Sequence, residues 1–126
     1  MSEEVLGEKK RLTLVITSPL SGRIPILVDD ILEPTKIADG IKIRWYPVIR
    51  GGGIEDIASY LIETAEGLVL PTVTGILSGF IHEKLKGIPD LKLEIEGLNV
   101  HRENREHIQR ILTEILKRSQ RGSGET

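Results

Sequence analysis

The residues best suited to chemistry are three consecutive glycines, Gly51–Gly53, preceded by Arg50 and followed by a segment with helical spacing. Backbone amides at a helix N-terminus can bind a phosphate group, and an arginine adds positive charge. The pattern, however, is neither GxxxxGK nor GxGxxG, and Glu55 and Asp56 already place negative charge there. A flexible strand-to-helix connection is therefore the favoured interpretation. The alternative is a small-ligand or nucleotide-binding site made of Arg50, Gly51, Gly52 and Gly53.

A second candidate is the uncharged stretch of residues 67–81. Gly75 and Gly79 have the four-residue spacing that lets two helices approach closely. A bilayer span needs about twenty apolar residues, so the stretch predicts a buried helix. The alternatives are an oligomer interface and reversible membrane contact. The interface residues would be Thr72, Gly75, Ile76, Gly79 and Phe80.

Metal binding and catalysis have little support in the sequence. The only imidazoles are His82, His101 and His107, and they match no zinc motif, since HExxH is absent and the chain has no cysteine. The acidic cluster in residues 29–33 lacks EF-hand spacing, and no serine lies in a GxSxG motif. We therefore expect no metal, no cofactor and no enzymatic activity.

The composition is that of one globular domain, with 126 residues of which 39% are hydrophobic and 29% charged. The absence of cysteine excludes disulfides and thiol nucleophiles. A formal net charge of −2 and a content of 3% aromatic residues both disfavour nucleic acid as a partner. The polar first ten residues lack the apolar run of a signal peptide, so we expect a cytoplasmic protein. The low content of Asn and Gln is typical of a thermophilic source.

The first half of the chain predicts two strands and a helix. Residues 12–17 are β-rich and end before Pro19, and residues 41–48 begin with alternating apolar and basic side chains. Residues 21–40 between them fit either an edge strand or a short helix. From position 54 to 65, apolar residues recur at helical spacing, which predicts a helix. These residues are Ile54, Ile57, Ala58, Leu61, Ile62 and Ala65.

The second half predicts a helix, a hairpin and a final helix. Pro71 suits the start of the first helix, which ends before Gly87. A hairpin follows with its turn at Glu96–Gly97, and Asn104 is expected to cap the last helix. The register of the hairpin would place Leu93 opposite Val100 and Ile95 opposite Leu98.

These elements give the order β-x-β-α-α-β-β-α and an α+β fold, in which a small mixed sheet of about four strands has helices packed on it. Residues 11–118 are expected to form a single domain. Residues 1–10 and 119–126 are expected to be disordered tails, because they offer little apolar surface to bury.

The layout also resembles a known family. The segments RLTLVIT, WYPVIRGGG, GILSGFIHEKLKG and LKLEIEGLNVHRENREHIQRILTEIL follow in the order and texture of the effector-associated constant component domains of prokaryotic conflict and defence systems. The similarity spans residues 11–116, and the chain departs from the family in having Leu85, where a Trp precedes the hairpin. The resemblance implies a non-enzymatic adaptor that couples a sensor or protease-like partner to an effector, with no catalytic residue to carry over.

We therefore expect a protein–protein interaction module that assembles with itself or with another protein. The surfaces expected to do so are the helix with Gly75 and Gly79 or the face of the hairpin. The alternatives are ligand binding at Gly51–Gly53 and reversible membrane association through residues 67–81.

Overall fold

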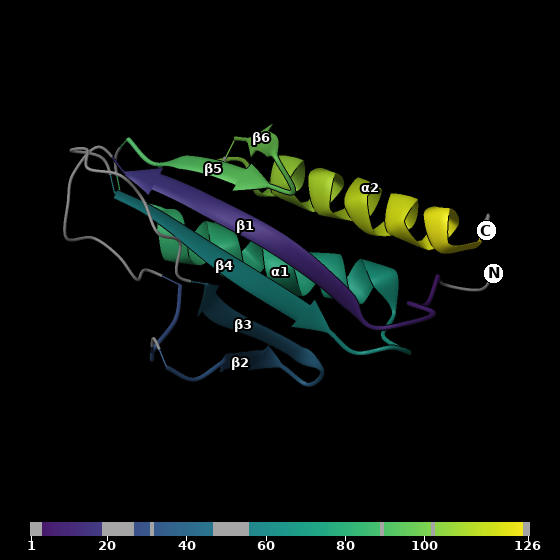
Figure 1. Ribbon diagram of the computed structural model, residues 1–126. Coiled ribbons are helices and arrows are strands. Elements are labelled where there is room, and N and C mark those ends of the chain that lie inside the picture. Colours follow the sequence, from purple (N-terminus) through teal and green to yellow (C-terminus); the bar gives the residue numbers. More distant parts are fainter. Residues whose placement is uncertain are drawn as a thin grey trace.

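Six antiparallel strands form one sheet in the described part of the chain, and two helices pack on one of its faces (Figure 1). The computed structural model describes residues 4–18, 27–30, 32–46, 56–88, 90–101 and 103–124. The strand order is β2-β3-β4-β1-β5-β6. The elements are β1 (Lys10–Ser18), β2 (Thr35–Ala38), β3 (Ile41–Tyr46), β4 (Asp56–Thr64), α1 (Leu70–Leu85), β5 (Lys92–Ile95), β6 (Leu98–Val100) and α2 (Arg105–Gly124). The predicted α+β class is confirmed, whereas the sheet is antiparallel and has six strands in place of about four.

β1 lies near the centre of the sheet because its alternating side chains suit a strand that is buried on one face. Leu12, Leu14 and Ile16 belong to the core and are at most 2% exposed. Arg11 and Thr13, which alternate with them, are exposed on the other face. β1 pairs with β4 along its whole length and with β5 over residues 14–17. It therefore joins the two halves of the sheet.

The helix predicted for residues 54–65 is wrong, because this part of the chain contains strand β4. Ala58, Tyr60 and Ile62 are at most 1% exposed on the face that the helices cover, while Ile57 and Leu61 are half-buried on the opposite face. A central strand with apolar residues on both faces reproduces the i, i+3, i+4 spacing of an amphipathic helix. Pairing with β3 on one side and β1 on the other satisfies its backbone groups.

The segment that fitted either a strand or a helix contains the short strand β2 in its described part. β2 forms a hairpin with β3, and the turn lies at Asp39 and Gly40. Gly40 has a φ of +81°, and a Cβ there would also come within 3.2 Å of a Leu68 methyl group. The positive φ favours glycine at this position, and a Cβ would also force the Leu68 side chain to shift. Residues 19–26 lie outside the described residues.

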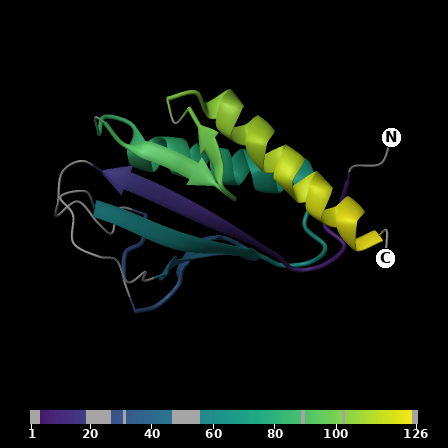
Figure 2. The same cartoon turned by 45° about the horizontal axis from the view of Figure 1, so that its top comes forward.

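α1 connects β4 to β5 by crossing over β1. β4 and β5 both run antiparallel to β1, which lies between them, so they are parallel to each other. α1 begins at Leu70, one residue before Pro71, whose missing N–H is not needed in the first turn. α2 lies beside α1 on the same side of the sheet (Figure 2). The opposite face is covered by neither of the described helices.

The predicted hairpin and the predicted cap of the last helix are both confirmed. The turn residues Glu96 and Gly97 have φ values of +50° and +82°, as a two-residue hairpin turn requires. The Asn104 side-chain oxygen accepts a hydrogen bond from the His107 N–H at 3.1 Å, which satisfies a free amide of the first helical turn. The observed pairs are Leu93 with Val100 and Ile95 with Leu98.

Residues 4–10, expected to belong to a disordered tail, are packed against the domain. Leu6 is 1% exposed and belongs to the core. Its N–H donates to the Leu68 carbonyl and its own carbonyl accepts from the Gly67 N–H, both at 2.8 Å. The burial of Leu6 and these backbone hydrogen bonds therefore anchor this end of the chain. At the other end, α2 continues to Gly124, past the boundary predicted at residue 118.

Candidate functional site

The glycine-rich candidate lies outside the described residues, because Arg50, Gly51, Gly52 and Gly53 all fall in the segment 47–55. The element that follows, from Asp56 onward, is strand β4 and not a helix. The described residues therefore do not supply the helix N-terminus that was to offer amides to a phosphate group. Ligand binding by the glycines stays a prediction.

Gly75 and Gly79 face α2 of the same chain. A Cβ on Gly79 would stand 3.1 Å from Arg105 Nη2, and a Cβ on Gly75 would stand 3.8 Å from Gln109 Nε2. Arg105 donates to the Gly75 carbonyl at 3.4 Å, and Gln109 donates to the Thr74 hydroxyl at 3.4 Å. The glycine spacing therefore allows α1 and α2 to approach closely within one domain.

The remaining residues of the predicted interface lie along α1. Thr72 is exposed, whereas Ile76 and Phe80 are half-buried and pack against the core. The Lys84 ammonium group lies 5.7 Å from the centre of the Phe80 ring, a distance at which a cation is attracted to the ring face. Part of the surface of Ile76 and Phe80 is thus already in contact with other residues of the same domain.

The histidines and acidic residues form no group able to hold a metal ion in the described part of the chain. The His101 N–H donates to Nδ1 of His107 at 3.0 Å, and the two ring centres are 4.9 Å apart. In the acidic cluster, the Asp30 carboxylate accepts from the Leu32 N–H at 2.8 Å, which is a local turn bond. Both arrangements order the connections between elements.

The face of the sheet opposite the helices carries apolar residues around a central serine, Ser59. This surface, called the open sheet face below, consists of every second residue of β3, β4, β1 and β5. The middle row of this face is Tyr46, Ser59 and Val15, of which Tyr46 is 53% exposed, Val15 is half-buried and Ser59 is 7% exposed. The half-buried Leu61 and Ile57 lie on either side of Ser59 along β4. Apolar residues on the uncovered face of a sheet offer a surface for another molecule. The face comprises alternate residues of 42–46, 57–63, 11–17 and 92–94.

Charged residues flank these apolar residues on both sides. β3 contributes Lys42 and Arg44, and Arg44 lies directly opposite Leu61. β5 contributes Glu94, opposite Val15, with Lys92 at the end of the strand. The following turn contributes Glu96, whose carboxylate accepts the Thr13 N–H at 2.6 Å. The open sheet face therefore has Lys42 and Arg44 on its β3 side, Glu94 and Glu96 with Lys92 on its β5 side, and between them Arg11, whose guanidinium lies 3.8 Å from the Glu63 carboxylate.

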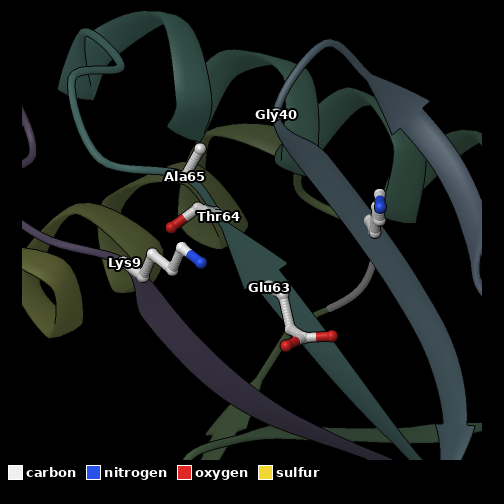
Figure 3. Close-up of a pocket in the computed structure, with 6 residues that line it drawn as sticks. Lys9, Gly40, Glu63, Thr64 and Ala65 are labelled. Atoms are coloured by element: carbon white, nitrogen blue, oxygen red, sulfur yellow. The ribbon is translucent and has the colours of Figure 1, made fainter.

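A hollow of about 300 Å³ lies at the end of β4, where β4 meets β3 and the start of β1 (Figure 3). The Ala65 N–H donates to the Gly40 carbonyl at 2.8 Å, which ties the β2–β3 turn to the end of β4. The Thr64 hydroxyl beside it is buried and has no hydrogen-bond partner among the described residues. The hollow is lined by Lys9, Gly40, Lys42, Glu63, Thr64 and Ala65.

Lys36 is the cross-strand neighbour of Lys42, but it is already paired. Its ammonium group lies 2.8 Å from the Asp39 carboxylate. This hydrogen bond, with the attraction between the two charges, raises the pKa of Lys36 and lowers the pKa of Asp39. Lys36 therefore adds no free positive charge to the hollow.

No protein-family model, no curated protein and no solved structure matches this chain. Among the described helices, none is both long and apolar enough to cross a membrane.

The sequence prediction missed the open sheet face because it assigned the residues of β4 to a helix. A period of two was nevertheless present, since Ala58, Tyr60 and Ile62 alternate with Ser59 and Leu61. Tyrosine and the β-branched isoleucines also favour strands. Given that alternation, the exposed partners in the neighbouring strand, Arg44 and Tyr46, could have been placed on the same face.

Proposed function

We propose that the protein is a non-enzymatic protein–protein interaction module that self-associates through the open sheet face. The observation that carries the proposal is the position of Leu61 and Val15 near the centre of a sheet face that neither described helix covers. Apolar residues inside a charged rim are the usual anatomy of a protein interface. The glycines of α1, by contrast, are already in contact with α2.

The distribution of charge favours a second copy of this chain as the partner. Consider a two-fold axis that lies between two stacked sheets and runs parallel to β1. Rotation about this axis places the β3 side of one copy over the β5 side of the other. Arg44 and Leu61 of each copy would then lie one cross-strand row away from Glu94 and Val15 of its partner, with Leu61 and Val15 next to the axis. One surface is thus complementary to itself.

On this proposal, the module acts as an adaptor, as the resemblance to the effector-associated constant component domains implies. Assembly of copies through the sheet would leave the helical side of each copy free for a sensor or an effector. This arrangement needs no catalytic residue.

The first test places a charge at the centre of the proposed interface. Leu61→Asp should shift sedimentation velocity profiles from dimer to monomer at concentrations where the unchanged protein is dimeric, because a carboxylate would be buried without a partner. Thr72→Asp is the matched control, since it adds the same charge on the exposed surface of α1. Circular dichroism confirms that both variants are folded. A strictly monomeric unchanged protein, or a dimeric Leu61→Asp variant, would refute the proposal.

The second test exchanges charges across the proposed axis and does not depend on tolerance of a buried charge. Arg44→Glu and Glu94→Arg should each weaken the dimer, because like charges then face each other between copies. The double variant should restore dimerisation, since opposite charges face each other again. Failure of the double variant to recover, with both single variants impaired, would contradict the two-fold arrangement.

A further inference from the structure

The imidazole of His107 closes the connection between β6 and α2. Its Nδ1 accepts a hydrogen bond from the His101 N–H at 3.0 Å, and the centres of the two rings are 4.9 Å apart. The Asn104 N–H donates to the His101 carbonyl at 3.1 Å, which folds the connection into a turn. His101 directly follows β6, whereas His107 lies in the first turn of α2. A side chain of α2 thus holds the end of β6.

The hydrogen bond to His107 exists only while its imidazole is neutral. A neutral imidazole has one nitrogen that accepts and one that donates, so acceptance at Nδ1 places the ring proton on Nε2. Protonation gives both nitrogens a hydrogen, and Nδ1 then no longer accepts the His101 N–H. A charge on His101 adds a second positive ring at 4.9 Å, which repels the first. Imidazole groups change charge between about pH 5 and 8, so the connection responds to mild acid.

The charged groups around the two histidines are of mixed sign. Those within one turn of His107, on α2 and the connection before it, are Glu103, Glu106 and Arg110. Those of β5, which border a second hollow together with His101, are Lys92 and Glu94. β6 contributes no charged side chain. α1 meets α2 through Arg105 and Gln109, which project from the opposite side of α2 from His107. Loss of the Nδ1 acceptor is therefore the main effect of protonation.

β6 is the element that this connection can release. It is an edge strand of three residues in the described sheet, in which Leu98 pairs with Ile95 and Val100 pairs with Leu93. It lies beside the start of α2 (Figure 1). A short strand at the edge of a sheet opens at a lower free energy than the rest of a domain. α2, in contrast, packs along α1. Loss of the bond between His101 and His107 therefore loosens β6 first.

We propose that His101 and His107 form an acid-sensitive switch between β6 and α2. At neutral pH the Nδ1 atom of His107 holds the end of β6, and protonation of His107 in mild acid releases the strand. Release leaves the outer edge of β5 without its partner strand. The switch depends on a bond within one chain and does not require self-association.

An NMR titration from neutral pH into mild acid tests the bond itself. The ring nitrogens of His107 should report a proton on Nε2 and none on Nδ1 at neutral pH. His101→Gln removes the second ring, so the amide proton of position 101 then reports His107 alone and should shift with the same midpoint as the His107 ring. Adding His107→Gln should abolish that shift. A proton on Nδ1 at neutral pH, or an amide of position 101 that does not follow His107, would overturn the proposal.

Hydrogen exchange of the β6 amides tests the release of the strand. The protection factors of Leu98 and Val100 should fall about fivefold on acidification, the effect of losing one hydrogen bond. In His107→Gln they should not change with pH, because the glutamine side chain does not titrate. His82→Gln is the matched control, since it removes a histidine of α1 and should keep the full response. Protection that is constant in the unchanged protein, or that falls equally in His107→Gln, would show that His107 does not control β6.

Discussion

Gly79 of α1 lies directly against Arg105 of α2, so closely that a Cβ on Gly79 would stand 3.1 Å from the Arg105 guanidinium. Gly75, one turn earlier, accepts a hydrogen bond from the same guanidinium through its carbonyl group. The small-residue spacing on α1 thus serves the packing of two helices within one chain. The proposed self-association therefore uses a different surface, the open sheet face, which neither of the described helices covers.

Gly75→Ala should stabilise the domain by about 0.5–1 kcal/mol, because alanine has a higher helix propensity than glycine. The added Cβ would be 3.8 Å from Gln109 Nε2, an ordinary contact distance. Urea unfolding followed by circular dichroism measures the change. Gly79→Ala should stabilise the domain less, since the new Cβ at position 79 would be 3.1 Å from Arg105 Nη2. A marked loss of stability or of the dimer in Gly75→Ala would show that the glycine has another role.

Leu6→Ala should destabilise the domain by about 2–5 kcal/mol, the usual cost of removing a fully buried leucine side chain. Val5→Ala is the control, because Val5 is 47% exposed and its neighbour Leu6 is 1% exposed. The stabilities of the two variants are compared by thermal and urea unfolding. Equal stability of Leu6→Ala and the unchanged protein would mean that residues 4–10 do not belong to the folded unit.

Asn104→Ala should cost about 1 kcal/mol of stability, because the first turn of α2 loses the acceptor of the His107 N–H. Asn104→Asp keeps an oxygen at the same position and should retain the stability of the unchanged protein. Denaturant unfolding gives both values. An unchanged midpoint for the alanine variant would contradict the capping role.

The stability of the β2–β3 turn should depend on pH through Asp39. The pKa of Asp39 is lowered by the hydrogen bond from Lys36 and by the positive charge of Lys36. A carboxylate with a lowered pKa stabilises the folded state above its ordinary pKa. This contribution is lost as the pH falls through the lowered value. An NMR titration should place the Asp39 midpoint below 3.8, and Lys36→Ala should return it to that value. An unshifted midpoint in the unchanged protein would show that the pair does not form in solution.

The sequence predicts those elements whose hydrophobic period has a single interpretation. β1, the hairpin around Glu96 and Gly97, and the capped start of α2 each combine a clear pattern with a turn or cap residue. The register of the hairpin follows from the two-residue turn, because a shift by one residue would expose Leu93 and Ile95. Local chemistry and burial agree in these segments.

β4 could not be predicted from its period because both of its faces carry apolar residues. Ile57 and Leu61 on one face, with Ala58 and Ile62 on the other, match helical spacing by coincidence. Its position between β3 and β1 depends on pairing with residues distant in sequence, which no local pattern reveals. The same holds for the hollow, where Lys9, Lys42 and Thr64 come from three strands or their ends.

The most direct test of the central proposal is the distance between copies, measured by pulsed electron paramagnetic resonance on single spin labels. The chain has no cysteine, so Thr13→Cys and Thr72→Cys each give one labelling site per copy. Stacked sheets pack about 10 Å apart, so labels at Thr13, on the open sheet face, should be closer together than labels at Thr72 on α1. A shorter distance at Thr72, or no dipolar coupling at Thr13 in a sample shown to be dimeric, would contradict assembly through the sheet.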